Sequence, residues 1–312
     1  MALNVASGTY TGNGSDPQTI TGVGFTPKVV FINAVDTGGG VSDNKAAQVK
    51  FTGMTTGASG VTGSVGENGQ LTAGLIDSFN SDGFLVRGLK NTSTVVYNYL
   101  ALGGSDVVVG TYTGNSSGAT TQAITGVGFQ PAAVFIQGGT SFTTFKFSSH
   151  SGATCSVSSA IADRSNCIDS LDADGFTVGT NITGAQTANN NATTYYYAAI
   201  KTGLSNVKIG NYSGNATDNR DITGVGFTPI AVIIKNTSTN QTATRYAEVG
   251  DLSSLVRNNV TPAANRIQSF SSDTFQIGTA NEVNASGSSN YNYIAFGATP
   301  SAVTFIPQIM MN

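Results

Sequence analysis

The sequence predicts an all-β protein made of three tandem antiparallel β-sandwich modules of a jelly-roll-like kind. An octapeptide, Ile-Thr-Gly-Val-Gly-Phe-Thr/Gln-Pro, begins at Ile20, Ile124 and Ile222, so its copies lie roughly 100 residues apart, a common size for a β-sandwich. Charged residues make up only 10% of the chain, whereas 39 of its 312 residues are Gly, 16 are Phe and 11 are Tyr. Many turn residues together with many aromatic residues are typical of short strands that bury a core.

Each module opens with a shorter repeat, Gly-x-Tyr-x-Gly-Asn, whose copies begin at Gly8, Gly110 and Gly210. Alternating Thr and Tyr before Gly-Asn predict a strand that ends in a turn. We expect this strand to be followed, after a short loop, by the octapeptide.

The octapeptide predicts a turn or bulge that leads into a new strand. Its glycines permit backbone angles that are closed to other residues, and its proline cannot donate a ladder hydrogen bond. An apolar run follows each copy, at Val29–Ile32, Val134–Ile136 and Val232–Ile234.

Two further signatures complete each module. The motif Ile-Asp/Gln-Ser-Phe/Leu-x-x-Asp-Gly/Thr-Phe begins at Ile76, Ile168 and Ile267, and an Asp-Gly pair between two strands is a strong hairpin signal. The third copy has Thr274 where the others have Gly, which predicts a different turn. A tyrosine-rich strand then closes each module, and less similar strands are expected in between, at Gln48–Phe51, Thr143–Phe147 and Ala243–Val249.

These repeats divide the chain into modules at residues 1–108, 109–208 and 209–298, followed by a tail at 299–312. The links between modules are short and apolar, which predicts modules that pack against one another rather than hang on flexible linkers.

Charge and hydropathy exclude several classes of partner. The net charge is −3 and the 14 Lys and Arg residues are spread thinly, so nucleic-acid binding has no electrostatic basis. No apolar run approaches the roughly 18 residues of a membrane span. The N-terminus lacks the pattern of a signal peptide, so we expect synthesis in a cytoplasm without export by the general secretory route.

The two cysteines, Cys155 and Cys167, both lie in the second module. Either they are free and partly buried, or they form a late disulfide. A metal site at this pair is not expected, because two thiolates and the single histidine of the chain make a poor ligand set.

The ordered series of four motifs resembles a repeat of virion structural proteins of tailed bacteriophages. The resemblance covers nearly all of residues 8–297, although members of that family often carry Trp in two strands and this chain has none. It implies a virion location, with other virion proteins such as the major capsid protein, or further copies of the chain, as partners. Capsid-surface decoration proteins and tail-fibre components both belong to this group.

The sequence does not predict an enzyme. His150 is the only histidine, no nucleophile elbow accompanies it, and we expect it on the surface or in a loop. The Gly-Val-Gly of the octapeptide lacks the other residues of a phosphate-binding loop.

Three carboxylates lie close together in the sequence of the second module. A calcium ion near Asp169, Asp172 and Asp174 is one interpretation, because calcium favours clustered oxygen ligands. The preferred interpretation is structural, with each aspartate bonding the backbone of its own turn. The third module replaces Asp169 by Gln268, and so the pattern does not recur; no cofactor is expected.

Two surfaces are candidates for binding. Alternation along the closing strands predicts that Tyr196, Asn98 and Asn292 point outwards, where they could face a glycan. The apolar tail either packs back or docks on a partner, and its candidate anchors are Phe305, Ile306, Ile309 and Met310.

The sequence therefore favours a non-enzymatic structural protein of a virion that decorates the capsid surface. The alternative is a tail-fibre or receptor-binding module that recognises host surface glycans.

Overall fold

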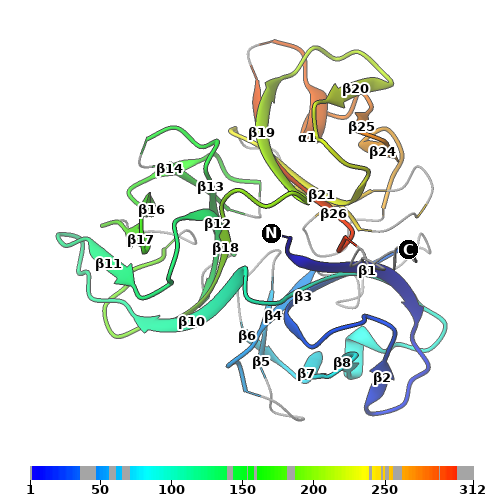
Figure 1. Ribbon diagram of the computed structural model, residues 1–312, viewed down its shortest axis with the longest axis horizontal. Helices are drawn as coiled ribbons and strands as arrows, with labels where there is room; N and C mark the ends of the chain where they lie inside the picture. Colours follow the sequence, from blue (N-terminus) through cyan, green and yellow to red (C-terminus); the bar gives the residue numbers. More distant parts are fainter. Residues whose placement is uncertain are drawn as a thin grey trace, which may run out of the picture.

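The computed structural model describes residues 2–35, 47–55, 61–64, 71–138, 143–152, 154–157, 160–180, 187–238, 241–246, 249, 253–255, 262–287 and 289–300. Three lobes of antiparallel strands surround a common centre, as if related by a threefold rotation (Figure 1). The predicted all-β class with antiparallel sandwiches is confirmed.

Each lobe contains one large sheet and one three-stranded sheet. In module 1 the large sheet has the strand order β1-β9-β3-β4-β5-β6 and the small sheet has the order β2-β8-β7. The elements of module 1 are β1 (Asn4–Thr11), β2 (Gln18–Ile20), β3 (Pro27–Ala34), β4 (Gln48–Phe51), β5 (Val61–Ser64), β6 (Leu71–Ala73), β7 (Ile76–Asn80), β8 (Gly83–Val86), the 3-10 helix η2 (Gly88–Lys90) and β9 (Val96–Gly103).

Modules 2 and 3 repeat this plan, with orders β10-β18-β12-β13-β14-β15 and β11-β17-β16, then β19-β26-β21-β22-β23 and β20-β25-β24. Their first strands begin at Val107 and Val207, slightly before the predicted boundaries at residues 109 and 209. Module 2 comprises β10 (Val107–Thr113), β11 (Gln122–Thr125), β12 (Pro131–Gly138), β13 (Thr144–Phe147), β14 (Thr154–Val157), β15 (Arg164–Ser165), β16 (Ile168–Asp172), β17 (Gly175–Val178) and β18 (Thr194–Lys201). Module 3 comprises β19 (Val207–Ser213), β20 (Arg220–Thr223), β21 (Pro229–Asn236), β22 (Ala243–Tyr246), β23 (Ser254–Leu255), β24 (Ile267–Ser271), β25 (Thr274–Ile277), α1 (Asn281–Asn284) and β26 (Asn290–Gly297).

The proline that ends each octapeptide starts the third strand of its module, and the register shifts directly after it. The shift lies between Pro27 and Val29 in β3 and recurs at the matching positions of β12 and β21. Of the predicted turn or bulge, the structure has a shift of register at the start of the new strand in all three modules.

The three inner strands of each large sheet are buried on both faces: β3, β4 and β9 in module 1, β12, β13 and β18 in module 2, and β21, β22 and β26 in module 3. One face packs on the small sheet of its own module, where Val30 and Ile32 join one cluster with Phe84. The other face points to the centre of the molecule, where Val29 and Phe31 join a second cluster. The continuous apolar runs after each octapeptide match strands that are covered on both sides.

The central cluster belongs to all three modules. It takes residues from matching positions of the three large sheets, so the modules share one core as well as having their own. The members at four such positions are Val5 and Val107; Phe31, Phe135 and Ile233; Phe51, Phe147 and Tyr246; and Leu102, Ile200 and Phe296.

Hydrogen bonds also cross the module boundaries. Asn33 Nδ2 of module 1 donates to Thr244 Oγ1 of module 3 at 2.7 Å, and Lys28 Nζ donates to the carbonyl oxygen of Val107 in module 2 at 3.1 Å. Near the two ends of the described chain, the Val5 amide donates to Thr299 Oγ1 at 2.7 Å. Modules 1 and 3 are thus joined directly, although they are far apart in the sequence.

Within each module, the glycine of Gly-x-Tyr lies under a tyrosine ring of the closing strand. A Cβ atom added at Gly110 would lie 2.6 Å from the hydroxyl oxygen of Tyr197, and Gly8 and Gly210 face tyrosines in the same way. The Tyr of the motif stacks on another closing-strand tyrosine, as Tyr112 does on Tyr195 with ring centroids 5.2 Å apart. This explains why Gly and Tyr recur together in the opening motif.

Candidate functional site

The octapeptide and the Asp-Gly hairpin form one clasp in every module. The two backbone N–H groups of Gly126 and Gly128 donate to the Asp174 carboxylate at 3.0 and 2.6 Å. Asp82 receives the same pair of bonds in module 1, and Asp273 in module 3. These bonds lower the pKa of Asp82 and Asp174 below the usual value. The expectation that Asp174 bonds the backbone of its own turn is wrong, because its carboxylate holds the octapeptide loop.

The third clasp uses a different turn, as Thr274 predicted. In modules 1 and 2 the turn residue with a positive φ angle is glycine, with φ of 157° at Gly83 and 149° at Gly175. In module 3 it falls on Asp273, with φ of 65°. Asp tolerates this region better than Thr does, so the same clasp survives without the glycine.

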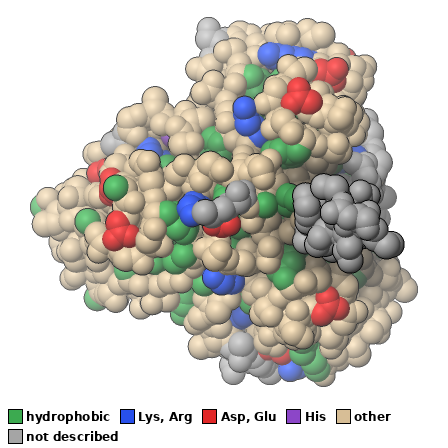
Figure 2. Space-filling view, viewed as in Figure 1, with side chains coloured by type: hydrophobic (Ala, Val, Ile, Leu, Met, Phe, Trp, Pro, Cys, Tyr) green, Lys and Arg blue, Asp and Glu red, His purple; other side chains and the backbone are tan. Residues whose placement is uncertain are grey.

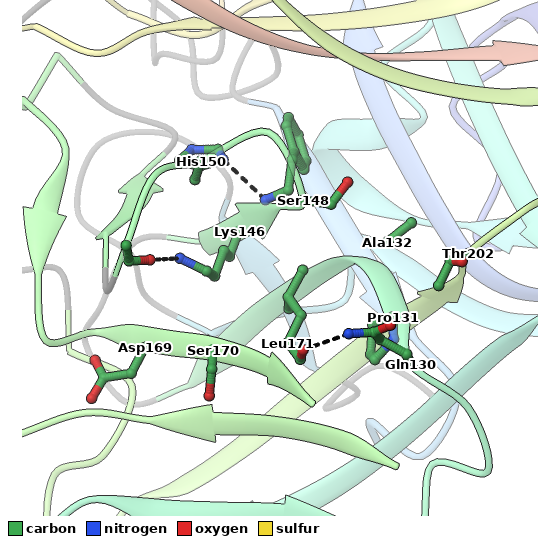
Figure 3. Close-up of a pocket in the computed structure, with 12 residues that line it drawn as sticks. Gln130, Pro131, Ala132, Lys146, Ser148, His150, Asp169, Ser170, Leu171 and Thr202 are labelled. Carbon is green, nitrogen blue, oxygen red and sulfur yellow. Dashed lines mark hydrogen bonds between the residues drawn. The ribbon is translucent and has the colours of Figure 1, made fainter. Parts of the chain in front are cut away.

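A pocket of about 500 Å³ opens in module 2 between its two sheets (Figure 3). Its walls come from the start of β12, the end of β13 with the turn after it, and β16. The lining includes Gln130, Pro131, Ala132, Lys146, Phe147, Ser148, His150, Asp169, Ser170 and Leu171. The side-chain amide of Gln130 donates to the carbonyl oxygen of Leu171 at 3.0 Å and ties β12 to β16.

Lys146 is a buried cation at the wall of this pocket. Its ammonium donates to the carbonyl oxygens of Gly152 and Thr154 at 2.7 and 2.6 Å, and burial lowers its pKa. Lys50 in β4 and Arg245 in β22 occupy the matching positions of modules 1 and 3 and are also buried. A buried basic residue on the fourth strand is thus a shared feature that the divergent sequences there concealed.

Of the two expected positions for His150, surface or loop, the structure has the loop: the residue lies in the turn after β13, where it is buried. Its Nδ1 atom accepts the backbone N–H of Phe147 at 3.0 Å, and its Nε2 atom lies 2.7 Å from Ser156 Oγ. The Ser156 hydroxyl in turn donates to Asp163 Oδ1 at 2.5 Å. Burial, with a further contribution from Lys146, lowers the pKa of His150 to about 3.

The direction of the hydrogen bonds from His150 through Ser156 to Asp163 differs from that in a nucleophilic triad. Because Nδ1 accepts a backbone N–H, the neutral imidazole of His150 carries its proton on Nε2 and donates to Ser156. A nucleophilic serine needs the reverse arrangement, in which histidine accepts the hydroxyl proton. Ser156 is also fully buried, so its oxygen is not presented to a substrate. The hydrogen bonds among His150, Ser156 and Asp163 therefore hold this part of module 2 together and do not activate Ser156.

The three carboxylates of the possible calcium site serve different places in module 2. Asp174 holds the clasp, Asp172 accepts the Thr177 hydroxyl at 2.8 Å, and Asp169 lines the pocket. Across the part of the chain that the structure describes, no group of three or more His, Cys, Asp or Glu side chains is placed to hold a metal ion.

The three residues expected to face a glycan are not on an open outer surface. Asn98 and Asn292 are 1% and 5% exposed, and Tyr196 packs against the central cluster. Alternation along β9, β18 and β26 was predicted correctly, but the side opposite each module core is the central interface rather than solvent.

Asn292 nevertheless lines a polar pocket of about 230 Å³ between modules 2 and 3. Ser149 Oγ donates to Asn292 Oδ1 across this boundary at 2.8 Å. All the lining residues carry hydroxyl, amide or carboxylate groups: Ser149, Ser151, Thr154, Asp163, Asn211, Thr237, Asn290 and Asn292.

Cys155 and Cys167 form a disulfide, with their Cα atoms 6.0 Å apart, which selects one of the two alternatives left open above. The tail residues Phe305, Ile306, Ile309 and Met310 lie outside the described residues.

The sequence did not single out Lys146, Ser156 or Asp163. One signal was available for the pocket: Leu171 replaces the Phe that the same motif carries in the other two modules. A smaller side chain at a core-facing position is a reason to look for space beside it.

Within the described ranges, no helix is both long and apolar enough to cross a membrane. No model of a known protein family matches the chain, and no curated protein matches it either.

Proposed function

We propose that this chain is a non-enzymatic structural protein of a bacteriophage virion, and that it decorates the outside of the capsid. The proposal starts from the four repeated motifs and their resemblance to virion proteins. The observation that carries it furthest is the shared core, in which three similar modules surround one centre.

Three modules around one centre suit a threefold-related position on a shell. A single chain would then present three similar edges to three similar subunits of the major capsid protein. The central cluster keeps these edges at fixed spacing, because no module can turn without breaking apolar contacts with both others.

The exposed surface supports attachment to the capsid through uncharged groups. Figure 2 shows one face dominated by uncharged polar side chains and backbone, with scattered acidic and basic groups. Attachment through such a surface rests on hydrogen bonds and apolar anchors, so it should depend little on salt.

The test is the copy number of the chain in purified virions, measured by quantitative mass spectrometry against the major capsid protein. Decoration requires hundreds of copies in a fixed ratio to the capsid subunits. A few dozen copies or fewer would exclude decoration and favour a fibre or receptor-binding role.

The tail can be tested separately by ending the chain after Thr299. Thr299 itself bonds to Val5, so this cut keeps the junction between modules 1 and 3. We expect the shortened chain to fold and to lose attachment to particles. If it attaches as the full chain does, Phe305, Ile306, Ile309 and Met310 are not the anchors.

The second candidate is recognition of host surface glycans by a tail-fibre or receptor-binding module. The polar pocket between modules 2 and 3 favours it, because hydroxyl, amide and carboxylate groups are suited to bonding sugar hydroxyls. A glycan array separates the candidates: the second one requires specific binding that Asn211→Ala abolishes.

A further inference from the structure

The pocket in module 2 occupies a place where the other modules carry a phenyl ring. Leu171 in β16 matches Phe79 in β7 and Phe270 in β24, since each follows Ile-Asp/Gln-Ser in the same motif. All three side chains pack against the core cluster of their own module. The branched four-carbon side chain of Leu171 is smaller than a benzyl group, so module 2 has unfilled space at this point.

A second wall position is also smaller in module 2. Ala132 follows the proline of the octapeptide, where module 1 has Lys28 and module 3 has Ile230. Ala132 and Leu171 line the same pocket, and Figure 3 labels both among its lining residues. Ala132 is therefore a second small residue at the wall of this pocket, beside Leu171.

Module 3 shows which chemistry fits beside the buried cation. The guanidinium carbon of Arg245 lies 4.8 Å from the ring centroid of Phe270, a cation–π contact. Lys146 holds the matching position in module 2, and Leu171, which lines the same pocket, stands where module 3 has that ring.

We propose that the pocket of module 2 binds an aromatic ring, a phenyl or phenol group, in the position that Phe79 and Phe270 hold in the sister modules. The ring would contact Leu171 and Pro131 and lie near the Lys146 ammonium. The volume of the pocket, about 500 Å³, falls in the usual range for small-ligand sites of about 300–1,000 Å³.

Polar groups at the wall favour a ring that carries a hydroxyl. Asp169, Ser170 and Gln130 line the pocket together with the apolar residues. A carboxylate or amide oxygen can accept a phenol O–H, whereas a purely apolar ring would leave these groups without that bond. Binding of a ring is measured on the chain alone and attachment is measured in virions, so the two proposals can fail independently.

The test is a titration of the full-length chain with phenol, followed by backbone amide chemical shifts. We expect shifts confined to residues around the pocket, with one site per chain. Leu171→Phe restores the residue of the sister modules and should weaken binding at least tenfold while keeping the fold. Ala132→Ile is a second filling variant, in case Leu171→Phe disturbs packing, and it should weaken binding as well.

The converse variant offers a gain of binding. Phe79→Leu in module 1 should open a matching space beside Lys50 and add a second set of shifts in that module. Unchanged binding by both filling variants, or no binding by the native chain, would overturn the proposal.

Two further probes define the ligand. Cyclohexanol has a saturated ring of similar size, and binding equal to that of phenol would overturn the assignment to an aromatic ring. N-acetyltyrosinamide carries the phenol on a peptide unit. If it binds as well as phenol, the ligand is an aromatic side chain of a polypeptide; if only phenol binds, the ligand is a free small molecule.

Discussion

Phe31 of module 1 and Phe135 of module 2 meet edge to face across the module boundary, with their ring centroids 5.5 Å apart. Neither ring belongs to the core of its own sandwich. Both lie in the central cluster, together with Ile233 of module 3. The stability of each module therefore depends on its neighbours.

The first prediction concerns this shared core. Phe135→Ala should lower the free energy of unfolding by about 3–5 kcal/mol, the usual cost of deleting a buried phenyl ring. Chemical denaturation followed by circular dichroism and by tyrosine fluorescence should show one coincident transition, shifted to lower denaturant. Two or more separate transitions, with only one of them moved, would show that the modules unfold independently.

The second prediction concerns the glycine under the tyrosine ring. Gly110→Ala would place a methyl group 2.6 Å from the hydroxyl oxygen of Tyr197, so the ring or strand must shift. Overpacking of this kind costs about 1–3 kcal/mol, measured as the change in the denaturation midpoint at constant slope. The neighbouring exposed variant Thr111→Ala is the control and should change stability little. Equal effects of the two variants would contradict the close contact.

The third prediction concerns the aspartate clasp. Because backbone N–H groups lower the folded-state pKa of Asp82 and Asp174, the ionised carboxylates contribute stability above the unfolded pKa near 3.8. This stability is lost as the pH falls through the lower folded pKa. The double variant Asp82→Asn, Asp174→Asn should therefore be less stable at pH 7 and less sensitive to acid below pH 4.

Thermal midpoints between pH 2 and pH 7 measure this effect. Asp221→Asn, on an exposed residue outside the clasp, is the matched control. A double variant that loses stability with acid as steeply as the native chain would argue against the clasp.

The fourth prediction uses the only histidine. Its folded pKa of about 3 lies below the ordinary value of 6.5, so the unfolded chain binds one more proton between these pH values. Stability should fall as the pH drops below 6.5, by at most about 1.4 kcal/mol per pH unit for one proton. The imidazole proton resonances of the native chain should not titrate between pH 8 and pH 4. A midpoint near 6.5 would mean that His150 is open to water.

Much of the module was readable from the repeats. The Asp-Gly hairpin, the bulge after the proline and the closing tyrosine strand follow from local backbone preferences, and these act within a few residues. The aspartate clasp joins segments about 50 residues apart, so no local pattern predicted it, although both partners recur in every module.

The central interface was harder to predict. Asn98 and Asn292 have polar side chains on the strand face opposite the module core, which normally indicates solvent. They are buried because two other modules cover that face. The four consecutive apolar residues of Val29–Ile32 indicated instead a strand that is buried on both faces, because a strand with one solvent-exposed face alternates apolar and polar residues. The buried Lys146 was hidden for a related reason: the carbonyl groups of Gly152 and Thr154 satisfy its charge, and their position depends on the fold.

The bond between Val5 and Thr299 closes the described chain into a ring of three modules. Asn206, at the link between modules 2 and 3, strengthens this closure by accepting the Leu3 amide at 2.9 Å. A ring has no privileged starting module. A circularly permuted chain that begins at the link before Val107 and joins Thr299 to Leu3 would keep every sheet, clasp and core contact of the native chain. The contacts that hold the modules together therefore do not depend on which module comes first in the sequence.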